Sequence, residues 1–457
     1  MTLENVVLKE GVNWVGVIDW NVRDFHGEHT SRGTTYNAYK IKDEKTVLID
    51  TVRDNFADKL IRKVNELTSF EKIDYIIVNH VEMDHSGSLP EIVKLAKNAS
   101  IIASKKGKEA LIEHYGPEFN RVEIVKTGDE LKIGKRTLRF IETPMLHWPD
   151  SMFTYIVEDK ILISNDAFGE HLASSGRFDD EVDPQVLMEE ARIYFANILT
   201  PFAPLIISKI QEVVKLGISI EMIAPDHGVI WRKEPSKIIE AYLRWSSGEA
   251  KRKAVIVYDT MWGSTDKMAK AIEEGVVSEG VETQVLKLRA TDETVIATEI
   301  LEAKAVIVGS PTLRNQMFPT VAAFFNYMTG LKPKGKVWAF FGSYGWSGGA
   351  VKEMLGMAKR EGFEVLEPSV EVKYIPDVED LKKCFDFGRQ IAAKVSNGAI
   401  NDKGDIVSEK DTLLRVYQCP FCGLQFAERD GEKFSDLPET WGCPFCGMPK
   451  EGFVLIG

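Results

Sequence analysis

Apolar residues in the first half of the chain fall into short runs that polar turns separate. Five of these runs have the length and composition of strands, at 12–18, 47–50, 101–103, 138–141 and 160–163. Two stretches, 91–97 and 183–199, have helical spacing instead. Strands and helices mixed in this way predict an α/β domain in which helices cover two sheets.

From residue 251 onward, long apolar strands alternate with amphipathic helices. The runs 252–258, 305–309 and 337–341 each read as a buried strand, and a helical pattern at 266–279 follows the first of them. This alternation predicts a doubly wound sheet of parallel strands, whose ligands bind beyond the carboxyl ends of the strands.

Composition changes again near the end of the chain. The segment 398–413 is rich in small, polar and turn-forming residues, so it is interpreted as a linker. We therefore expect three domains, at 1–250, 251–397 and 414–457, with the linker between the last two.

The overall composition narrows the class of protein. The 457 residues are 44% hydrophobic and 28% charged, as in ordinary globular proteins, and the net charge of −12 opposes binding to nucleic acid. No apolar stretch approaches the length of a membrane helix, and residues 1–5 lack the basic start of a secretory signal. A cytoplasmic protein without membrane or nucleic-acid partners is expected.

The hexapeptide His80-Val81-Glu82-Met83-Asp84-His85 places four metal-binding side chains directly after the apolar run 73–79. The pattern predicts a strand that ends in a loop, in which short side chains converge on metal without helical geometry. Two imidazoles with two carboxylates suit iron or manganese better than thiolates or imidazoles alone would. Three further candidates, His147, Asp166 and His227, also follow apolar runs. Taken singly, each histidine could be a hydrogen-bonded core residue.

The ordered set resembles the metallo-β-lactamase superfamily, with Asp50 in the place of its early aspartate. Glu82 stands where the hydrolytic members have histidine, and this replacement is the pattern of the flavodiiron proteins. The resemblance implies an αββα sandwich with two non-haem irons. One iron would be bound by His80, Glu82 and His147, the other by Asp84 and His227, with Asp166 bridging them. His85 is a ligand in some members and unbound in others.

The turn 259–265 lies between a predicted strand and helix and is rich in hydroxyl groups. It lacks the glycine patterns of dinucleotide and triphosphate loops, so a monophosphate is the expected ligand. The turn resembles the phosphate loop of flavodoxins, which implies FMN. The loops 310–316 and 342–349 also follow strands. The candidate FMN contacts are Thr260, Met261, Trp262, Gly263, Ser264, Thr265, Pro311, Thr312, Leu313, Asn315, Gln316, Ser343, Tyr344, Gly345, Trp346 and Gly348.

Four cysteines form two pairs near the end of the chain, Cys419 with Cys422 and Cys443 with Cys446. Paired thiolates without a secretory signal indicate a metal site. The segment resembles rubredoxin, which implies one iron held by the four cysteines. Only 20 residues separate the pairs, fewer than in an ordinary rubredoxin and within the spacing of zinc ribbons, so zinc remains an alternative.

These resemblances imply an oxidoreductase that reduces O2 to water, NO to N2O, or both. Electrons would pass from an NAD(P)H-linked reductase or another donor protein through the cysteine site and FMN to the two irons. The family also implies a head-to-tail homodimer or homotetramer. His26 and Tyr194 are our candidate catalytic residues, able to donate protons or hydrogen bonds. Two alternatives are a zinc hydrolase with appended redox modules and a non-catalytic electron relay.

Overall fold

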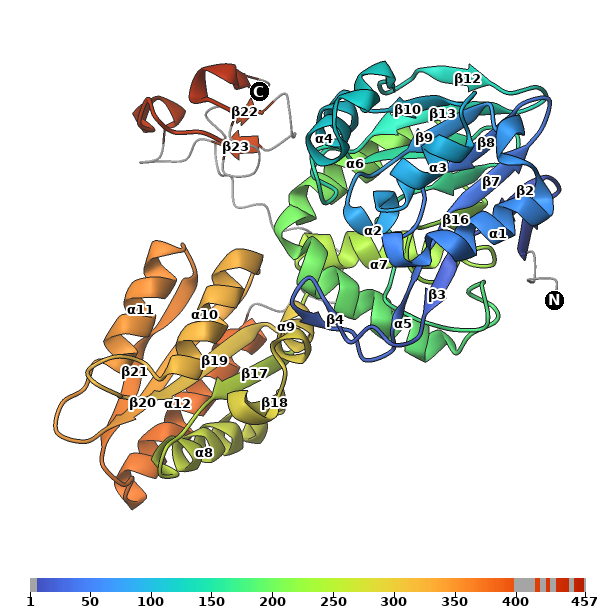
Figure 1. Ribbon diagram of the computed structural model, residues 1–457. Coiled ribbons are helices and arrows are strands. Elements are labelled where there is room, and N and C mark those ends of the chain that lie inside the picture. The colour runs from blue at the N-terminus through green and yellow to red at the C-terminus, as the bar shows by residue number, and fades with distance from the viewer. Residues whose placement is uncertain (1–5, 398–415, 420–424, 428–432, 444–447, 456–457) are drawn as a thin grey trace. The chain divides into compact units, whose positions relative to one another are not determined.

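The computed structural model describes residues 6–397, 416–419, 425–427, 433–443 and 448–455. The chain divides into two compact units (Figure 1). The first comprises Met1–Tyr194, Phe202–Leu243 and Lys410–Gly457, and the second comprises Phe195–Pro201 and Arg244–Glu409.

The first unit contains two large sheets. The seven-stranded sheet has the order β1 (Val6–Lys9), β2 (Val12–Trp14), β7 (Tyr39–Lys42), β8 (Thr46–Ile49), β9 (Tyr75–Val78), β10 (Ser100–Ala103) and β11 (Glu123–Ile124). The five-stranded sheet has the order β12 (Glu130–Lys132), β13 (Thr137–Glu142), β14 (Met152–Ile156), β15 (Ile161–Ile163) and β16 (Met222–Ala224). Two pairs of short strands lie between β2 and β7 in the chain, β3 (Val17–Asp19) with β6 (Thr34–Tyr36) and β4 (Asp24–Phe25) with β5 (Glu28–His29).

Successive side chains of a strand point to opposite faces of the sheet and pack into different parts of the core. In β9, Ile76 packs with Leu60 of helix α1 (Ala57–Leu67), whereas Ile77 packs with Phe140 and Ile163 of the other sheet. The two sheets therefore share one core, and helix α1 covers the outer face of the first of them, as predicted for two sheets covered by helices. The remaining helices of this part of the chain are α2 (Met83–Ser86), α3 (Leu89–Leu95), α4 (Lys105–Tyr115), α5 (Pro184–Tyr194), α6 (Ala203–Lys215) and α7 (Pro235–Ser247).

Two predicted elements are interrupted. The run 12–18 divides into β2 and β3, which belong to different sheets. A side chain at Gly16 would place its Cβ 2.4 Å from the Tyr36 carbonyl oxygen, so the chain makes a close approach there instead of continuing the strand. The predicted helix 183–199 ends as α5 at Tyr194 and continues as a π-helical turn, Phe195–Leu199.

The helical stretch Pro184–Lys215 is long and apolar enough, by length and composition alone, to cross a membrane, with a mean hydropathy of 1.4. Core helices of folded domains pass the same test, and this stretch contributes Leu187, Ala191 and Leu205 to the buried interior. One such helix is weak evidence for a membrane span.

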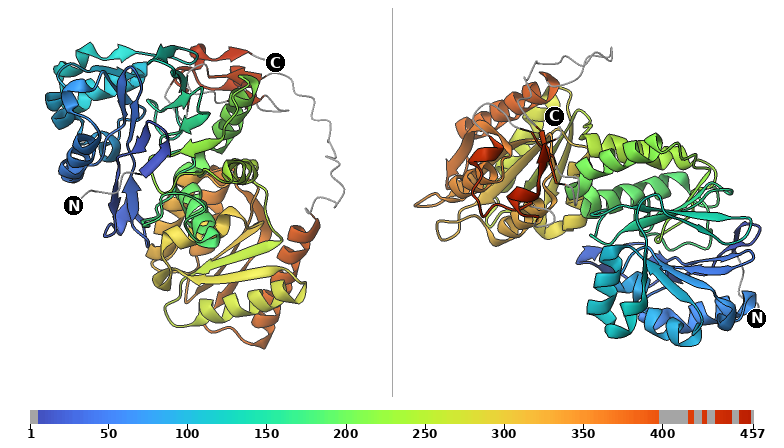
Figure 2. Two further views of the ribbon diagram at one scale, coloured as in Figure 1. Left: turned by 90° about the vertical axis from the view of Figure 1, so that its right-hand side faces the viewer. Right: turned by 90° about the horizontal axis from the view of Figure 1, so that it is seen from above.

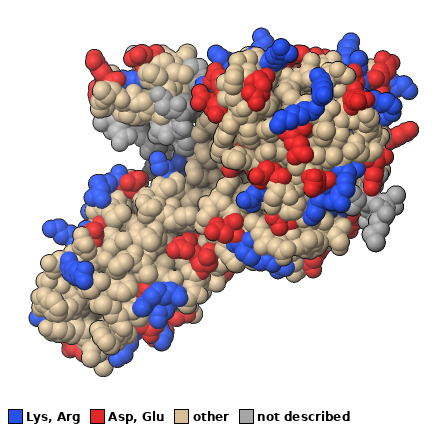
Figure 3. All heavy atoms as spheres, viewed as in Figure 1, with Lys and Arg blue, Asp and Glu red and all other residues tan. Residues whose placement is uncertain are grey.

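Acidic and basic side chains are interspersed on the face of the protein that Figure 3 shows.

The second unit is built on a five-stranded parallel sheet (Figure 2). Its order is β18 (Glu282–Lys287), β17 (Lys253–Tyr258), β19 (Ala305–Pro311), β20 (Val337–Tyr344) and β21 (Glu364–Lys373). Helices α8 (Ser264–Ser278) and α12 (Val378–Asn397) pack on one face, and α9 (Glu293–Leu301), α10 (Pro319–Leu331) and α11 (Ala350–Arg360) on the other. The order 2-1-3-4-5 is that of flavodoxin-like sheets, which confirms the doubly wound prediction.

The C-terminal segment contains the small sheet β23 (Gln425–Ala427), β22 (Val416–Gln418) and β24 (Val454–Leu455). The rings of Tyr417 and Phe434 stack with centroids 4.2 Å apart. Cys419 and Cys443 are buried. Cys422, Cys446 and the predicted linker 398–413 lie outside the described residues.

Candidate functional site

The hexapeptide begins at the end of β9, but its second half is helical. Glu82 caps the single turn α2, and its carbonyl oxygen accepts hydrogen bonds from the backbone N–H groups of His85 and Ser86, at 3.0 and 2.9 Å. The prediction that this segment is a loop without helical geometry is therefore wrong, because residues 83–86 form a helical turn. The turn separates Glu82 from Asp84 and His85, so that these side chains join two different groups of potential ligands.

The first group consists of His80, Glu82, His147 and Asp166. His80 Nε2 lies 3.2 Å from Glu82 Oε2, and His147 Nε2 lies 2.7 Å from Asp166 Oδ2 and 3.4 Å from Glu82 Oε2. Two imidazoles and two carboxylates thus present nitrogen and oxygen to one point. Such a set suits a divalent iron or manganese ion.

The second group consists of Asp84, His85 and His227. Asp84 Oδ2 lies 3.1 Å from Nε2 of both His85 and His227. Asp166 Oδ1 faces this group, 2.9 Å from His85 Nε2 and 3.5 Å from His227 Nε2. Because Asp166 Oδ2 faces the first group, the two oxygens of one carboxylate serve two adjacent sites. His85 Nε2 lies close enough to Asp84 and Asp166 to be one of the potential ligands of the second group.

Buried negative charge at this position indicates that the residues fit two cations. Among the described residues, both carboxylate oxygens of Asp84 and Oδ1 of Asp166 are buried and accept no hydrogen bond, although Asp84 Oδ2 and Asp166 Oδ1 lie 3.1 and 2.9 Å from His85 Nε2. Buried carboxylates are costly unless positive charge compensates them. Burial disfavours a charged ring at His85, but the charges of Asp84 and Asp166 outweigh burial and raise its pKa well above the usual value. The site therefore attracts positive charge.

Buried groups behind the ligands orient them. Asp150 Oδ2 lies 3.0 Å from His80 Nδ1 and accepts the Val81 backbone N–H at 2.7 Å. His227 Nδ1 lies 2.7 Å from the Thr35 carbonyl oxygen. Such contacts hold each ring with Nε2 toward the metal position. Sequence reasoning missed Asp150, although a carboxylate three residues after His147 was an available signal.

Two further buried carboxylates, those of Asp50 and Asp226, lie in the same part of the first unit. The backbone N–H and side-chain amide of Asn79 donate to Asp50, at 2.7 and 2.9 Å. Asp226 Oδ2 lies 3.8 Å from His85 Nδ1, and the Asp226 carboxylate accepts no hydrogen bond among the described residues. Asp226 was not among the predicted site residues, although it follows β16 as His227 does, and it forms a third group of potential ligands with His85 and Asp166.

Of the two predicted catalytic residues, His26 contacts the first group of potential ligands and Tyr194 lies beside the second. His26 Nε2 is hydrogen-bonded to Glu82 Oε1, and about a third of its side chain is exposed. Tyr194 is buried, with its ring centroid 5.0 Å from that of His171 and 6.1 Å from that of His227. His171, to which sequence reasoning assigned no role, therefore lies in the wall of the site.

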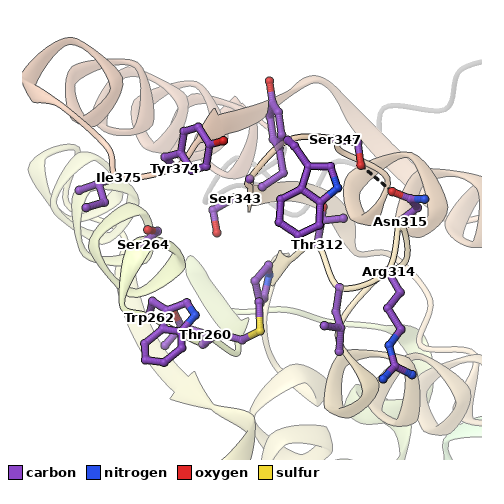
Figure 4. A pocket seen from close by; sticks show the side chains of 16 residues that line it. Thr260, Trp262, Ser264, Thr312, Arg314, Asn315, Ser343, Ser347, Tyr374 and Ile375 are labelled. Carbon is purple, nitrogen blue, oxygen red and sulfur yellow. Dashed lines mark hydrogen bonds between the residues drawn. The ribbon is translucent and has the colours of Figure 1, made fainter.

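A cavity of about 840 Å³ opens at the carboxyl ends of the strands in the second unit (Figure 4). Twelve predicted FMN contacts line it, whereas Gly263, Thr265, Gln316 and Gly348 do not. The cavity is also lined by Arg314, Ser347, Tyr374 and Ile375. Tyr374 and Ile375 follow β21, a strand that the three-loop prediction did not use.

The walls of the cavity combine a phosphate-binding turn with aromatic edges. Thr260 Oγ1 accepts the Gly263 N–H at 3.0 Å, so its hydroxyl hydrogen can donate to an anion at the start of α8. Thr265 is turned inward, where its hydroxyl lies 2.9 Å from that of Ser343. Asn315 Oδ1 accepts a hydrogen bond from Ser347 at 2.6 Å, which joins two of the loops (Figure 4). The cavity therefore suits a flat ring system that carries one phosphate.

Comparisons with known proteins identify the families of both domains. Residues 35–228 match the family described as ODP family beta lactamase, and residues 256–388 match Flavodoxin. A nitric oxide reductase of Moorella thermoacetica is 48% identical over 395 residues, covering 86% of this chain and 99% of the relative. An anaerobic nitric oxide reductase flavorubredoxin of Escherichia coli is 39% identical over 448 residues, covering 95% of this chain and 93% of the relative.

Two solved structures are similar along most of their length. Rubredoxin oxygen:oxidoreductase of Desulfovibrio gigas has a TM-score of 0.85 and 38% identity, covering 86% of this chain and 99% of that one. The flavodiiron protein of Giardia intestinalis has a TM-score of 0.84 and 38% identity, covering 87% and 98%.

A two-sheet β-lactamase-like domain with two adjacent metal-ligand groups, followed by a flavodoxin-like domain, defines a class of two-metal flavoproteins. The chain belongs to the flavodiiron family. The family resemblance inferred from the sequence is confirmed, and the alternative of a zinc hydrolase is not favoured.

Proposed function

We propose that this flavodiiron protein is an oxidoreductase that reduces O2 to water, NO to N2O, or both. The observation that carries the proposal is the position of Asp166, whose two oxygens face two separate groups of potential metal ligands. The names of the relatives, nitric oxide reductase and rubredoxin oxygen:oxidoreductase, support both substrates.

The protein side chains hold the site and supply protons. When bound, FMN would supply electrons, and two non-haem irons would supply electrons and open coordination positions for a diatomic gas. Asp150 orients His80, and Asp166 holds the two metal positions together. The partly exposed ring of His26 exchanges protons with solvent and shares one at Nε2 with Glu82 Oε1. Tyr194 offers its phenol hydrogen from the buried side.

We further propose that 1–250, 251–397 and 414–457 are the diiron, FMN and rubredoxin-like domains, with an αββα sandwich in the first. The four cysteines of the last domain would hold one iron that accepts electrons from an NAD(P)H-linked reductase or another donor protein. The alignment with the Escherichia coli flavorubredoxin over 95% of this chain supports the assignment. Zinc at this site is the alternative, and a ferric-thiolate absorbance band of the purified protein decides between them.

The FMN cavity has an apolar rim that supports self-association. Trp262, Trp346 and Ile375 all line the cavity. Their exposed fractions are 93%, 89% and 71%. Indole rings left in water at a cofactor site favour burial by a partner surface. We infer a head-to-tail homodimer or homotetramer in which this rim is covered by another copy of the chain.

The direct test is anaerobic turnover of the reduced protein with NO and, separately, with O2. N2O formation and O2 consumption are measured on protein whose iron and FMN contents are known. Turnover of either gas is the expected result, and failure with both gases at full iron and FMN content would refute the proposal. Metal analysis separates the alternatives, because zinc in place of iron indicates a hydrolase and an empty site indicates a non-catalytic relay.

A further inference from the structure

A buried carboxylate lies directly beneath the predicted phosphate turn. Asp259 follows β17, and its side chain is fully buried. Its Oδ1 accepts the Thr260 backbone N–H at 2.7 Å, and its Oδ2 accepts the Thr320 hydroxyl at 2.6 Å. Burial opposes ionisation, but the hydrogen bonds from Arg289 and Thr320 outweigh it and lower the pKa of Asp259 below its usual value. A negative charge therefore stands under a turn that is expected to bind an anion.

Arg289 compensates this charge from the neighbouring strand. It lies in the short helical turn Leu288–Ala290, which follows β18, the strand paired with β17. Its Nε lies 2.9 Å from both oxygens of Asp259, and its Nη2 lies 2.8 Å from Oδ1. The same Nη2 donates a hydrogen bond to the Thr260 carbonyl oxygen. Arg289 is not among the residues that line the cavity.

We propose that Arg289 is a positioning residue for the FMN phosphate. Its guanidinium cancels the charge of Asp259 and holds the backbone of Thr260 from outside the cavity, so that the turn presents hydroxyl and N–H donors to the phosphate. The inference rests on the proposed binding of FMN. Without the guanidinium, an uncompensated carboxylate would face a phosphate dianion across one turn of backbone.

The charge argument predicts that replacing Arg289 weakens FMN binding, whereas replacing Asp259 does not. Arg289→Met weakens FMN binding by about tenfold or more, because repulsion between Asp259 and the phosphate is no longer screened. Asp259→Asn leaves FMN affinity unchanged or raises it, because the guanidinium then acts on the phosphate alone. The double variant Asp259→Asn/Arg289→Met recovers most of the loss. A purely structural role would make all three variants bind less tightly.

The test is a fluorescence titration of the full-length apoprotein with FMN and, in parallel, with riboflavin, which lacks the phosphate. For Arg289→Met, riboflavin affinity is expected to change by less than about threefold. Arg289→Lys keeps the charge but not the double contact, so an intermediate loss is expected. Arg389→Met, which removes an exposed arginine paired with Glu279 in the same unit, is the matched control. Melting temperatures of all variants report folding.

The outcomes separate this inference from the proposed function. A wild-type apoprotein that binds no FMN would refute the proposed function itself. Wild-type FMN binding with equal affinity in Arg289→Met would overturn only the role of Arg289. Equal losses of FMN and riboflavin affinity in that variant would also overturn it, because the effect would then not depend on the phosphate.

Discussion

Asp166 is the residue on which the metal site depends. Its Oδ2 contacts His147 of the first ligand group, while Oδ1 contacts His85 of the second. The second group is buried, whereas Glu82 and His147 of the first are only partly buried, and each group brings a further carboxylate, Glu82 in one and Asp84 in the other. A single side chain that serves two cations needs two equivalent oxygens and a negative charge, which only aspartate or glutamate provides.

Asp166→Asn is expected to reduce the iron held outside the cysteine site from about two ions per chain to one or fewer, because an amide has one oxygen and no charge. Metal analysis of the purified variant checks this, and the FMN content should stay unchanged. Asp180→Asn, which breaks an exposed ion pair with Arg232, is the control. Full iron content in Asp166→Asn would contradict the bridging role.

At the scale of elements, the loops after parallel strands form the FMN cavity only if they approach each other closely. Gly349 has a φ of +151°, and a Cβ there would lie 2.2 Å from the Asn315 carbonyl oxygen. The loop after β20 therefore touches the loop after β19 at a residue that has no side chain. The hydrogen bond between Ser347 and Asn315 joins the same two loops.

Gly349→Ala is expected to destabilise the second unit by about 1–3 kcal/mol and to weaken FMN binding, because the added methyl meets backbone. Gly356→Ala is the matched control, since Gly356 lies within helix α11 and a Cβ there meets only Arg360, at 3.8 Å. That control should stabilise the unit by about 0.5–1 kcal/mol. Melting temperature and FMN titration measure both effects, and equal behaviour of the two variants would refute the steric argument.

Lys336 makes the second unit sensitive to pH. Burial, with the charge of Lys304 adding to it, lowers the pKa of Lys336 from 10.5 to about 7. Between these values the unfolded chain binds a proton that the folded chain does not, so the free energy of unfolding rises with pH from about 7 to 10. The gain is on the order of 3 kcal/mol. Its neutral amine can still donate to the Leu301 carbonyl oxygen, at 2.7 Å.

Urea unfolding between pH 6 and 10, followed by the fluorescence of released FMN, measures this dependence. Lys336→Met should flatten the rise, although its absolute stability also changes because the Leu301 carbonyl loses its donor. Lys352→Met, at an exposed position of α11, provides the reference slope. An unchanged slope in Lys336→Met would contradict the assignment.

At the scale of the whole molecule, the exposed rim of the FMN cavity determines the proposed assembly. Trp262→Ser/Trp346→Ser is expected to shift the FMN-loaded protein toward the monomer, because the two most exposed indoles of the rim are removed. Analytical ultracentrifugation measures the shift. Val214→Ser, at a 70% exposed apolar position on α6, should leave the assembly unchanged. A wild-type monomer, or an unchanged assembly in the tryptophan variant, would argue against the rim as the interface.

Local pattern was enough to predict the types of element and most candidate site residues. Apolar runs mark buried strands, and polar residues that follow them, such as His80 and Asp166, lie where loops gather at a sheet edge. The same rule predicted that Thr260 and Ser343 line the cavity, although Ser343 lies near the end of β20 and not in a loop. It failed at 83–86, because a single helical turn has no periodicity that a sequence can show.

The sequence by itself determined the α/β units, the order of the candidate ligands and the family to which the chain belongs. Only the tertiary structure decided which oxygen of Asp166 faces which ligand group, that Asp150 lies behind His80, and that Arg289 compensates Asp259. Each of these is a contact between side chains from different segments. Their distances depend on the packing of the sheets and not on the neighbours of either residue along the chain.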